Sequence, residues 1–298
     1  ENLPSSASMT LTGGKIWGEV SESFLSTLKN NLSAGGKTYR PVSLWINWPV
    51  TDNSKQHLIL GGGEKFLHPN VDPSLLSGIM LNPMQQSEPS KIALFSGAQY
   101  SWKQWKSEEE AKKINDIAFN FVENGHFEDS KVSAAFRELG KHMINQNMDN
   151  RVVKLEESVD LAPKLTYFMT KLKAGQDVTA ERAALRAEFA KIKEAAELYK
   201  ASGDKKMVAQ IHYWLDNAID QMNALDAFLT GTEAMDTNDA AKLWDSYYKG
   251  LKLYEQSQTH TFHYVDHMEK AELGVQHIRP FILSLKEVLA SEVQKVLH

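Results

Sequence analysis

The sequence lacks cysteine entirely among its 298 residues. This absence excludes disulfide bonds, thiol nucleophiles and zinc sites built from thiolates. No apolar run approaches the roughly 20 residues that a membrane-spanning helix needs, and no charged-then-apolar signal sequence opens the chain. The net charge of −5 offers no overall attraction for nucleic acid. The composition, 42% hydrophobic and 24% charged, is typical of a soluble globular protein.

Several catalytic signatures are also missing. The glycines at 61–63 are not followed by Gly-Lys-Ser/Thr, so a phosphate-binding P-loop is not expected. The sequence holds no Gly-x-Ser-x-Gly, which excludes an α/β-hydrolase nucleophile elbow. No two aspartates are adjacent, so the chain offers no paired carboxylates of that kind.

The most informative stretch is a predicted strand at residues 42–47 with a polar loop after it. Apolar and polar residues alternate along it with the period of two that a strand requires. Pro49 has no N–H and should end the pairing. Asn47 and Asp52 then stand near two tryptophans, an arrangement that suits a sugar with hydroxyls at its rim and C–H groups on its face. The alternative is a strand end whose polar residues bond only to a turn.

The first third of the chain alternates strands with helices. Strands are predicted at 8–11, 42–47 and 77–81, and helices at 21–32 and 89–102. Such alternation favours a parallel sheet, in which ligand groups gather at the carboxyl ends of the strands. Asn47, Asp52 and Asn82 all follow strands in this way. About three strands are too few for a closed barrel, so the α/β part is incomplete.

From about Glu108 onward the sequence predicts helices and no good strand. Apolar stripes with helical spacing follow one another and should pack as an antiparallel bundle. Turns are expected at Gly175, at 202–204 and at Gly231. Pro280 suits the first turn of the last helix.

Two groups of side chains in this half are candidates for other chemistry. His260, His263 and His267 have the spacing of one helix face, where neutral imidazoles could bind Zn²⁺ or Cu²⁺. The alternative is a polar, partly solvated helix face. The glutamate runs at 108–110 and 156–157 are interpreted as solvated helix surfaces, because adjacent helical residues diverge by about 100°.

Five short motifs follow one another in order along the first half of the chain. They are Trp45–Asp52, Leu60-Gly61, Asn82-Pro83-Met84, Ser90-Lys91-Ile92 and Tyr100-Ser101-Trp102. This series resembles glycoside hydrolase family 84, the β-N-acetylglucosaminidases that include bacterial hyaluronidases and O-GlcNAcases. His142, Met148–Asn150 and Ala162-Pro163 resemble the family's segment between barrel and helical domain. The similarity covers roughly Leu11 to Leu165.

The resemblance implies a fold. Residues 1–150 would be the carboxyl-terminal portion of a (β/α)8 catalytic barrel, beginning near its sixth strand. Residues 151–298 would be the post-catalytic helical bundle. The fold class expected is therefore α/β followed by all-α, with the barrel incomplete in this chain.

The resemblance also implies roles for four residues. Trp45 would wall the pocket for the N-acetyl group and Asn47 would hydrogen-bond there, while Asp52 and Asn82 would bind sugar hydroxyls. In the family the substrate's own acetamido oxygen attacks the anomeric carbon with retention, assisted by an aspartate pair on the fourth strand. This sequence does not contain that strand, so the chain alone is predicted to be inactive.

The expected partners are a GlcNAc-containing glycan or glycoprotein and the missing N-terminal half of the barrel. No cofactor, nucleic acid or membrane span is expected, and the family implies a secreted or cell-surface bacterial protein. Two rival hypotheses remain: a non-catalytic helical interaction module with a vestigial α/β cap, and a metal protein built on the three histidines.

Overall fold

A computed structural model describes residues 4, 6–16, 18–144, 146 and 153–297 of the chain. The chain divides into two compact units. The first, here called the α/β unit, comprises residues 1–54, 58–130 and 144–155, and the second, the helical unit, comprises 55–57, 131–143 and 156–298. The boundary expected between residues 150 and 151, and the motif at 148–150, lie outside the described residues.

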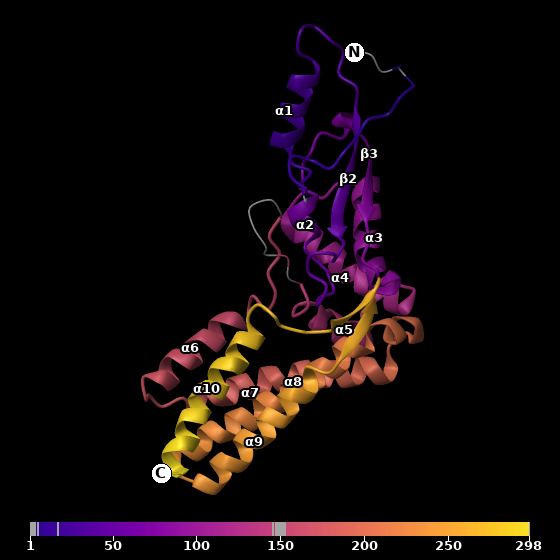
Figure 1. The fold of residues 1–298 in the computed structure, drawn as a ribbon. Coiled ribbons are helices and arrows are strands. Elements are labelled where there is room, and N and C mark those ends of the chain that lie inside the picture. The colour runs from indigo at the N-terminus through magenta and orange to yellow at the C-terminus, as the bar shows by residue number, and fades with distance from the viewer. Residues whose placement is uncertain (1–3, 5, 17, 145, 147–152, 298) are drawn as a thin grey trace. The chain divides into compact units, whose positions relative to one another are not determined.

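The α/β unit is built around a small parallel sheet (Figure 1). Its strands are β1 (Thr10–Leu11), β2 (Val42–Pro49) and β3 (Leu76–Asn82), in the spatial order β1-β2-β3. The helices that alternate with and follow them are α1 (Glu22–Leu32), α2 (Gly63–Phe66), a 3₁₀ turn η1 (Pro73–Leu75), α3 (Ser87–Trp102) and α4 (Glu108–Asn124). The predicted alternation and the parallel sheet are confirmed.

The two faces of this sheet have different surroundings. Val42, Leu44 and Ile46 of β2 are buried, because one face is covered by helices. Gly97 of α3 lies so close to Leu81 of β3 that an added Cβ would stand 2.5 Å from the leucine side chain. A glycine is therefore needed where α3 packs on β3. On the other face, Trp45 is 40% exposed.

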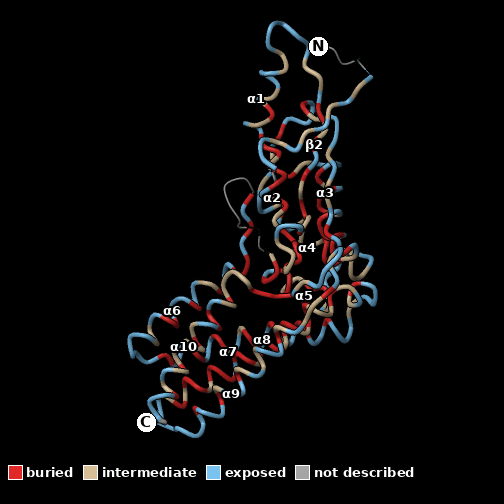
Figure 2. The backbone as a smooth tube through the Cα atoms, viewed as in Figure 1, coloured by how far each residue is buried: buried red, intermediate tan, exposed pale blue. Residues whose placement is uncertain are grey.

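The helical unit consists of long amphipathic helices and one hairpin. It contains α5 (Lys131–Gly140), α6 (Ala162–Lys173), α7 (Thr179–Ser202), α8 (Lys205–Asp236), α9 (Ala240–Ser257), strands β4 (Thr261–Tyr264) and β5 (His267–Lys270), and α10 (Ile278–Leu297). Buried and exposed residues alternate along α7 and α8, with the buried ones facing neighbouring helices (Figure 2). Across its described residues the chain is thus mostly helical with a small parallel sheet.

One predicted turn in this unit is wrong. Gly231 does not end a helix, because α8 continues through it to Asp236. A Cβ at this position would stand 3.1 Å from the side chain of Leu289 in α10. The glycine therefore serves the close approach of two helices and marks no break. The other two turns lie where they are expected, at Gly175 and at Gly203.

The histidine segment is a β-hairpin and not a helix face. β4 and β5 pair antiparallel, and His263 lies opposite Met268 in their register. His260 lies 2.7 Å from Asp220, whereas His267 lies 2.9 Å from Asp266. The prediction that the three histidines share one helix face is therefore wrong. The expectation that no strand follows residue 108 is also wrong. Within the described residues, no cluster of three or more such side chains is arranged to hold a metal ion.

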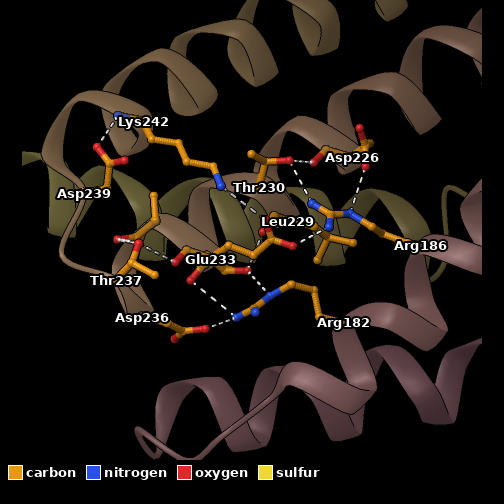
Figure 3. A network of polar contacts seen from close by, with 12 residues as sticks. Arg182, Arg186, Asp226, Leu229, Thr230, Glu233, Asp236, Thr237, Asp239 and Lys242 are labelled. Carbon is orange, nitrogen blue, oxygen red and sulfur yellow. Dashed lines mark hydrogen bonds and ion pairs between the residues drawn. The ribbon is translucent and has the colours of Figure 1, made fainter.

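A network of polar contacts joins α7 to the end of α8 (Figure 3). The side chain of Arg182 is only 5% exposed, and it donates to Thr232 Oγ1 at 2.9 Å and to Asp236 at 2.6 Å. Arg186 contacts Asp226 and Glu233 and is one third exposed. Because Arg182 is buried and Arg186 is not, we expect the first to contribute more to stability.

Replacing Arg182 with methionine should lower the free energy of unfolding by about 1–3 kcal/mol, because the buried Thr232 loses a charged donor. The matched change Arg186→Met should cost under about 1 kcal/mol, the range of an exposed ion pair. Urea unfolding of both variants measures the difference. Equal losses would contradict the role assigned to burial.

No helix among the described residues combines the length and the apolar character that a membrane crossing requires.

Candidate functional site

Three polar side chains meet on the open face at the carboxyl end of the sheet. Trp45 Nε1 donates to Asn47 Oδ1 at 2.8 Å, and Asn82 Nδ2 donates to the same oxygen at 3.0 Å. Asn47 comes from β2 and Asn82 from β3, and β-sheet pairing places Pro49 opposite Asn82. The structure therefore brings together three of the four residues that the sequence predicts for sugar binding.

The amide of Asn47 is held in one orientation. Its oxygen accepts from Trp45 and Asn82, while its Nδ2 donates to the backbone carbonyl of Ile16 at 2.6 Å. Each asparagine amide has two N–H groups, so one N–H of each is left for a ligand. The Ile16 carbonyl is a component that sequence reasoning missed, since it lies 31 residues away in a loop without a motif.

The fourth predicted residue, Asp52, lies beyond the strand. It is exposed in the turn after Pro49, and its Oδ1 accepts from Asn53 Nδ2 at 3.1 Å. Thr51, which precedes it, is buried. The turn is thus anchored by one side chain and presents the next to solvent. Within the described part of the chain, the hydrogen bond of Asp52 is to Asn53 and not to the other three residues.

Only one of the two neighbouring tryptophans belongs to this surface. Trp48 is fully buried, and its Nε1 donates to the carbonyl of Gly61 at 2.9 Å. It also stacks on Phe66 at 6.0 Å between ring centroids. Trp48 is therefore part of the core on the helix-covered face, as strand alternation requires. Of these two tryptophans, Trp45 is the one that offers an indole face to a ligand.

The chemistry available here is recognition of a neutral polar ligand. Among the described residues, the hydrogen-bond partners of Trp45, Asn47 and Asn82 are indole, amide and peptide groups, and none is a carboxylate. Amides and an indole can bind hydroxyl groups and an apolar sugar face, but they do not transfer protons at neutral pH. The arrangement supports binding and does not by itself supply acid–base catalysis.

Surface depressions occur elsewhere in the chain. A depression of about 310 Å³ between α6 and α10 is lined by Leu165, Met169 and Phe281 among others. One of about 190 Å³ lies by Leu76 and Tyr100, near the amino end of β3. In parallel sheets, ligands bind beyond the carboxyl ends of the strands. The Trp45 surface is therefore the better candidate.

Sequence reasoning also missed a buried polar group in the helical unit. Glu157 was interpreted as part of a solvated run, but it is fully buried, whereas its neighbour Glu156 is exposed. His57 and Glu272 are also buried, and His57 Nδ1 lies 3.7 Å from Glu157 Oε2. Hydrophobic spacing does not reveal which of two adjacent glutamates faces inward.

Two family models match successive parts of the chain. A family model described as β-N-acetylglucosaminidase matches residues 1–141, and one described as hyaluronidase post-catalytic domain-like matches residues 160–261. These two matches support a glycoside hydrolase 84-like family for this chain.

Solved structures share the fold. The structure of CpGH84D has a TM-score of 0.85 at 24% identity and covers 97% of this chain and 46% of that chain. The structure of CpGH84B gives 0.73 at 22%, with 95% and 45% covered. A mutant of the Thermobaculum terrenum O-GlcNAc hydrolase gives 0.73 at 18%, with 98% and 57% covered. This chain thus spans about half the length of the structures that it matches.

Replacing Asn47 with alanine should release both Trp45 and Asn82, because the amide oxygen that accepts from them is removed. In ¹H–¹⁵N spectra the Trp45 indole and Asn82 side-chain signals should shift. The indole signal of the buried Trp48 serves as the internal control and should stay in place. Unchanged Trp45 and Asn82 signals would contradict the shared acceptor.

Proposed function

We propose that this chain supplies the sugar-binding part of a retaining, substrate-assisted β-N-acetylglucosaminidase that acts on terminal GlcNAc of glycans or glycoproteins. The observation that carries the proposal is the cluster of Trp45, Asn47 and Asn82 at the carboxyl end of the sheet. It occurs within the segment that matches the β-N-acetylglucosaminidase family model.

The sheet supports the idea that this unit completes a barrel. Its strands are parallel and lie in sequential order, as successive strands of a (β/α)8 barrel do. Helices cover one face, while the other bears Trp45 and Met80, both about 40% exposed. In a closed barrel that second face would line the interior. We infer that the three strands are the last of the eight.

Within the site, each side chain has a distinct task. The indole of Trp45 forms a wall for the N-acetyl group, and its fixed position follows from the bond to Asn47. The remaining N–H of Asn47 donates a hydrogen bond to the ligand in the same pocket. Asn82 and the exposed Asp52 bind sugar hydroxyls. The carboxylate of Asp52 accepts two hydrogen bonds, which are stronger than those to a neutral acceptor because the carboxylate is charged.

The acid–base groups are proposed to lie outside this sequence. In the substrate-assisted mechanism the acetamido oxygen of the substrate attacks the anomeric carbon, so no enzyme nucleophile is needed. One aspartate orients the acetamido group and a second donates the proton to the leaving oxygen. The neutral partners of Trp45, Asn47 and Asn82 are consistent with a division of labour in which this chain binds and other strands catalyse.

A secreted or cell-surface bacterial location remains part of the proposal. It rests on the family alone.

Replacing Asp52 with alanine should lower kcat/KM about 10- to 200-fold in a protein in which the missing barrel strands are restored to this chain. That loss corresponds to about 1.5–3 kcal/mol, the range for a hydrogen bond to a charged group. The matched control is Asp245→Ala, which removes an exposed aspartate from α9 and should leave kcat/KM unchanged. Near wild-type kcat/KM for the Asp52 variant would refute the assignment.

A further inference from the structure

The helical unit contains a buried polar group that the proposed function does not use. Residues 55–57 belong to this unit, although the chain on either side of them belongs to the α/β unit. His57 is 2% exposed, and the carboxylates of Glu157 and Glu272 are 0% and 1% exposed. Buried ionisable groups are costly unless each is paired or neutralised.

Two of the charges balance each other. Arg279 at the start of α10 donates to Glu272 Oε2 at 2.9 Å. This ion pair engages one oxygen of Glu272, whose Oε1 is buried without a hydrogen-bond partner among the described residues. Glu157 and His57 are left to satisfy one another.

One oxygen of Glu157 is well bonded. Oε1 accepts from the backbone N–H groups of Gln276 and His277, just before α10, with the second bond at 3.3 Å. In return, the side chain of Gln276 accepts from the backbone N–H of Glu157 at 3.4 Å. Glu157 thus fixes the residues that lead into α10.

The other oxygen faces a ring nitrogen at a distance too long for a hydrogen bond. Glu157 Oε2 and His57 Nδ1 are 3.7 Å apart, and both are buried without a hydrogen-bond partner among the described residues. The ring of His57 makes a hydrogen bond to the backbone of Met143. Because Nδ1 has no partner, this bond must come from Nε2, and Nε2 is therefore the protonated nitrogen. A neutral ring then presents a lone pair to a carboxylate lone pair. One added proton removes that repulsion and gives both atoms a partner.

We propose that Glu157 and His57 share one proton, and that this proton holds residues 55–57 against the segment before α10 until the pH rises above neutrality. This chain segment follows Asp52 by three residues, so the pair holds the chain just past the candidate sugar-binding loop. The proposal does not depend on the sugar-binding function. Gln56 fixes the same segment independently of pH. Its backbone carbonyl accepts from Trp214 Nε1 at 2.7 Å and from the Glu272 N–H at 3.1 Å.

The charged surroundings favour a single proton on the pair. Burial raises the pKa of Glu157 to about 8, with Glu272 adding to the rise and Arg279 opposing it. Burial, with Arg279 beside it, lowers the pKa of His57 to about 3, so a second proton is disfavoured. Burial also raises the pKa of Tyr254, with Glu272 adding to the rise and Arg279 opposing it.

His142, another buried histidine of this unit, has its Nδ1 2.8 Å from Ser158 Oγ and its Nε2 3.7 Å from Glu138 Oε1.

The direction of the pH effect follows from proton uptake. The pKa of Glu157 lies above its ordinary value of 4.5, so the native state binds a proton that the unfolded chain releases at neutral pH. His57 acts in the opposite direction below its ordinary pKa of 6.5, because the unfolded chain then binds a proton that the buried ring does not. The contribution of the pair is therefore nearly level between pH 4.5 and 6.5 and is lost as the pH rises from 6.5 through about 8. In that upper range the folding equilibrium constant should fall up to tenfold per pH unit, or about 1.4 kcal/mol.

The test compares urea unfolding of the whole chain with that of Glu157→Gln between pH 5 and 9. Glutamine keeps an oxygen for the two backbone N–H groups and can donate to His57 without titrating. The variant should lose the steep part of the pH dependence. The control Glu156→Gln removes the exposed neighbouring carboxylate and should keep the wild-type slope. A Glu157→Gln profile that parallels the wild type would overturn the proposal.

A measurement on the unaltered chain keeps the proposal testable even if that variant fails to fold. ¹⁵N spectra of histidine-labelled protein report which ring nitrogen carries the proton. His57 should show a protonated Nε2 and an accepting Nδ1, unchanged from pH 5 to 7. A proton on Nδ1 alone, or full protonation of the ring near pH 6, would overturn the shared-proton account.

Discussion

The structure of the α/β unit depends on the alternation of side chains along β2. Strand geometry sends successive side chains to opposite faces, so Val42, Leu44 and Ile46 enter the core while Trp45 and Asn47 emerge on the other side. The core face binds the helices, and this binding fixes the register in which β3 pairs with β2. That register in turn brings Asn82 to Asn47. A slip of one residue in the strand pairing would bury the amide of Asn47 and expose the side chain of Leu44. The recognition surface is therefore a consequence of core packing.

Strong local signals made much of the fold predictable. Period-two alternation located β2, and Ser21, whose side chain accepts from the backbone N–H of Phe24, marked the start of α1. The family motifs located the candidate site, and three of its four predicted residues meet as neighbours. Asp52 stays a prediction, because it is exposed in a turn and its hydrogen bond comes from the adjacent Asn53.

The failures share a physical cause, which is dependence on distant parts of the chain. His260, His263 and His267 fit a helical spacing, yet pairing between β4 and β5 decides their structure. His260 bonds to Asp220, 40 residues earlier. The buried Glu157 accepts at Oε1 from the backbone N–H of Gln276, 119 residues later. Gly231 suggested a turn, but Leu289 of another helix accounts for it. Local periodicity carries no information on such contacts.

The central claim is that this chain contributes sugar recognition and that the catalytic acids lie elsewhere. Hydrolysis of a fluorogenic β-N-acetylglucosaminide by the purified chain, with intact mass recorded on the same sample, tests it directly. The account predicts no turnover from a sample whose only species is the 33.6 kDa chain. Turnover in a sample that also contains an additional barrel fragment would agree with the account, because that fragment would carry the acids. Turnover by the 33.6 kDa species alone would contradict it, since the acids would then have to lie within these 298 residues.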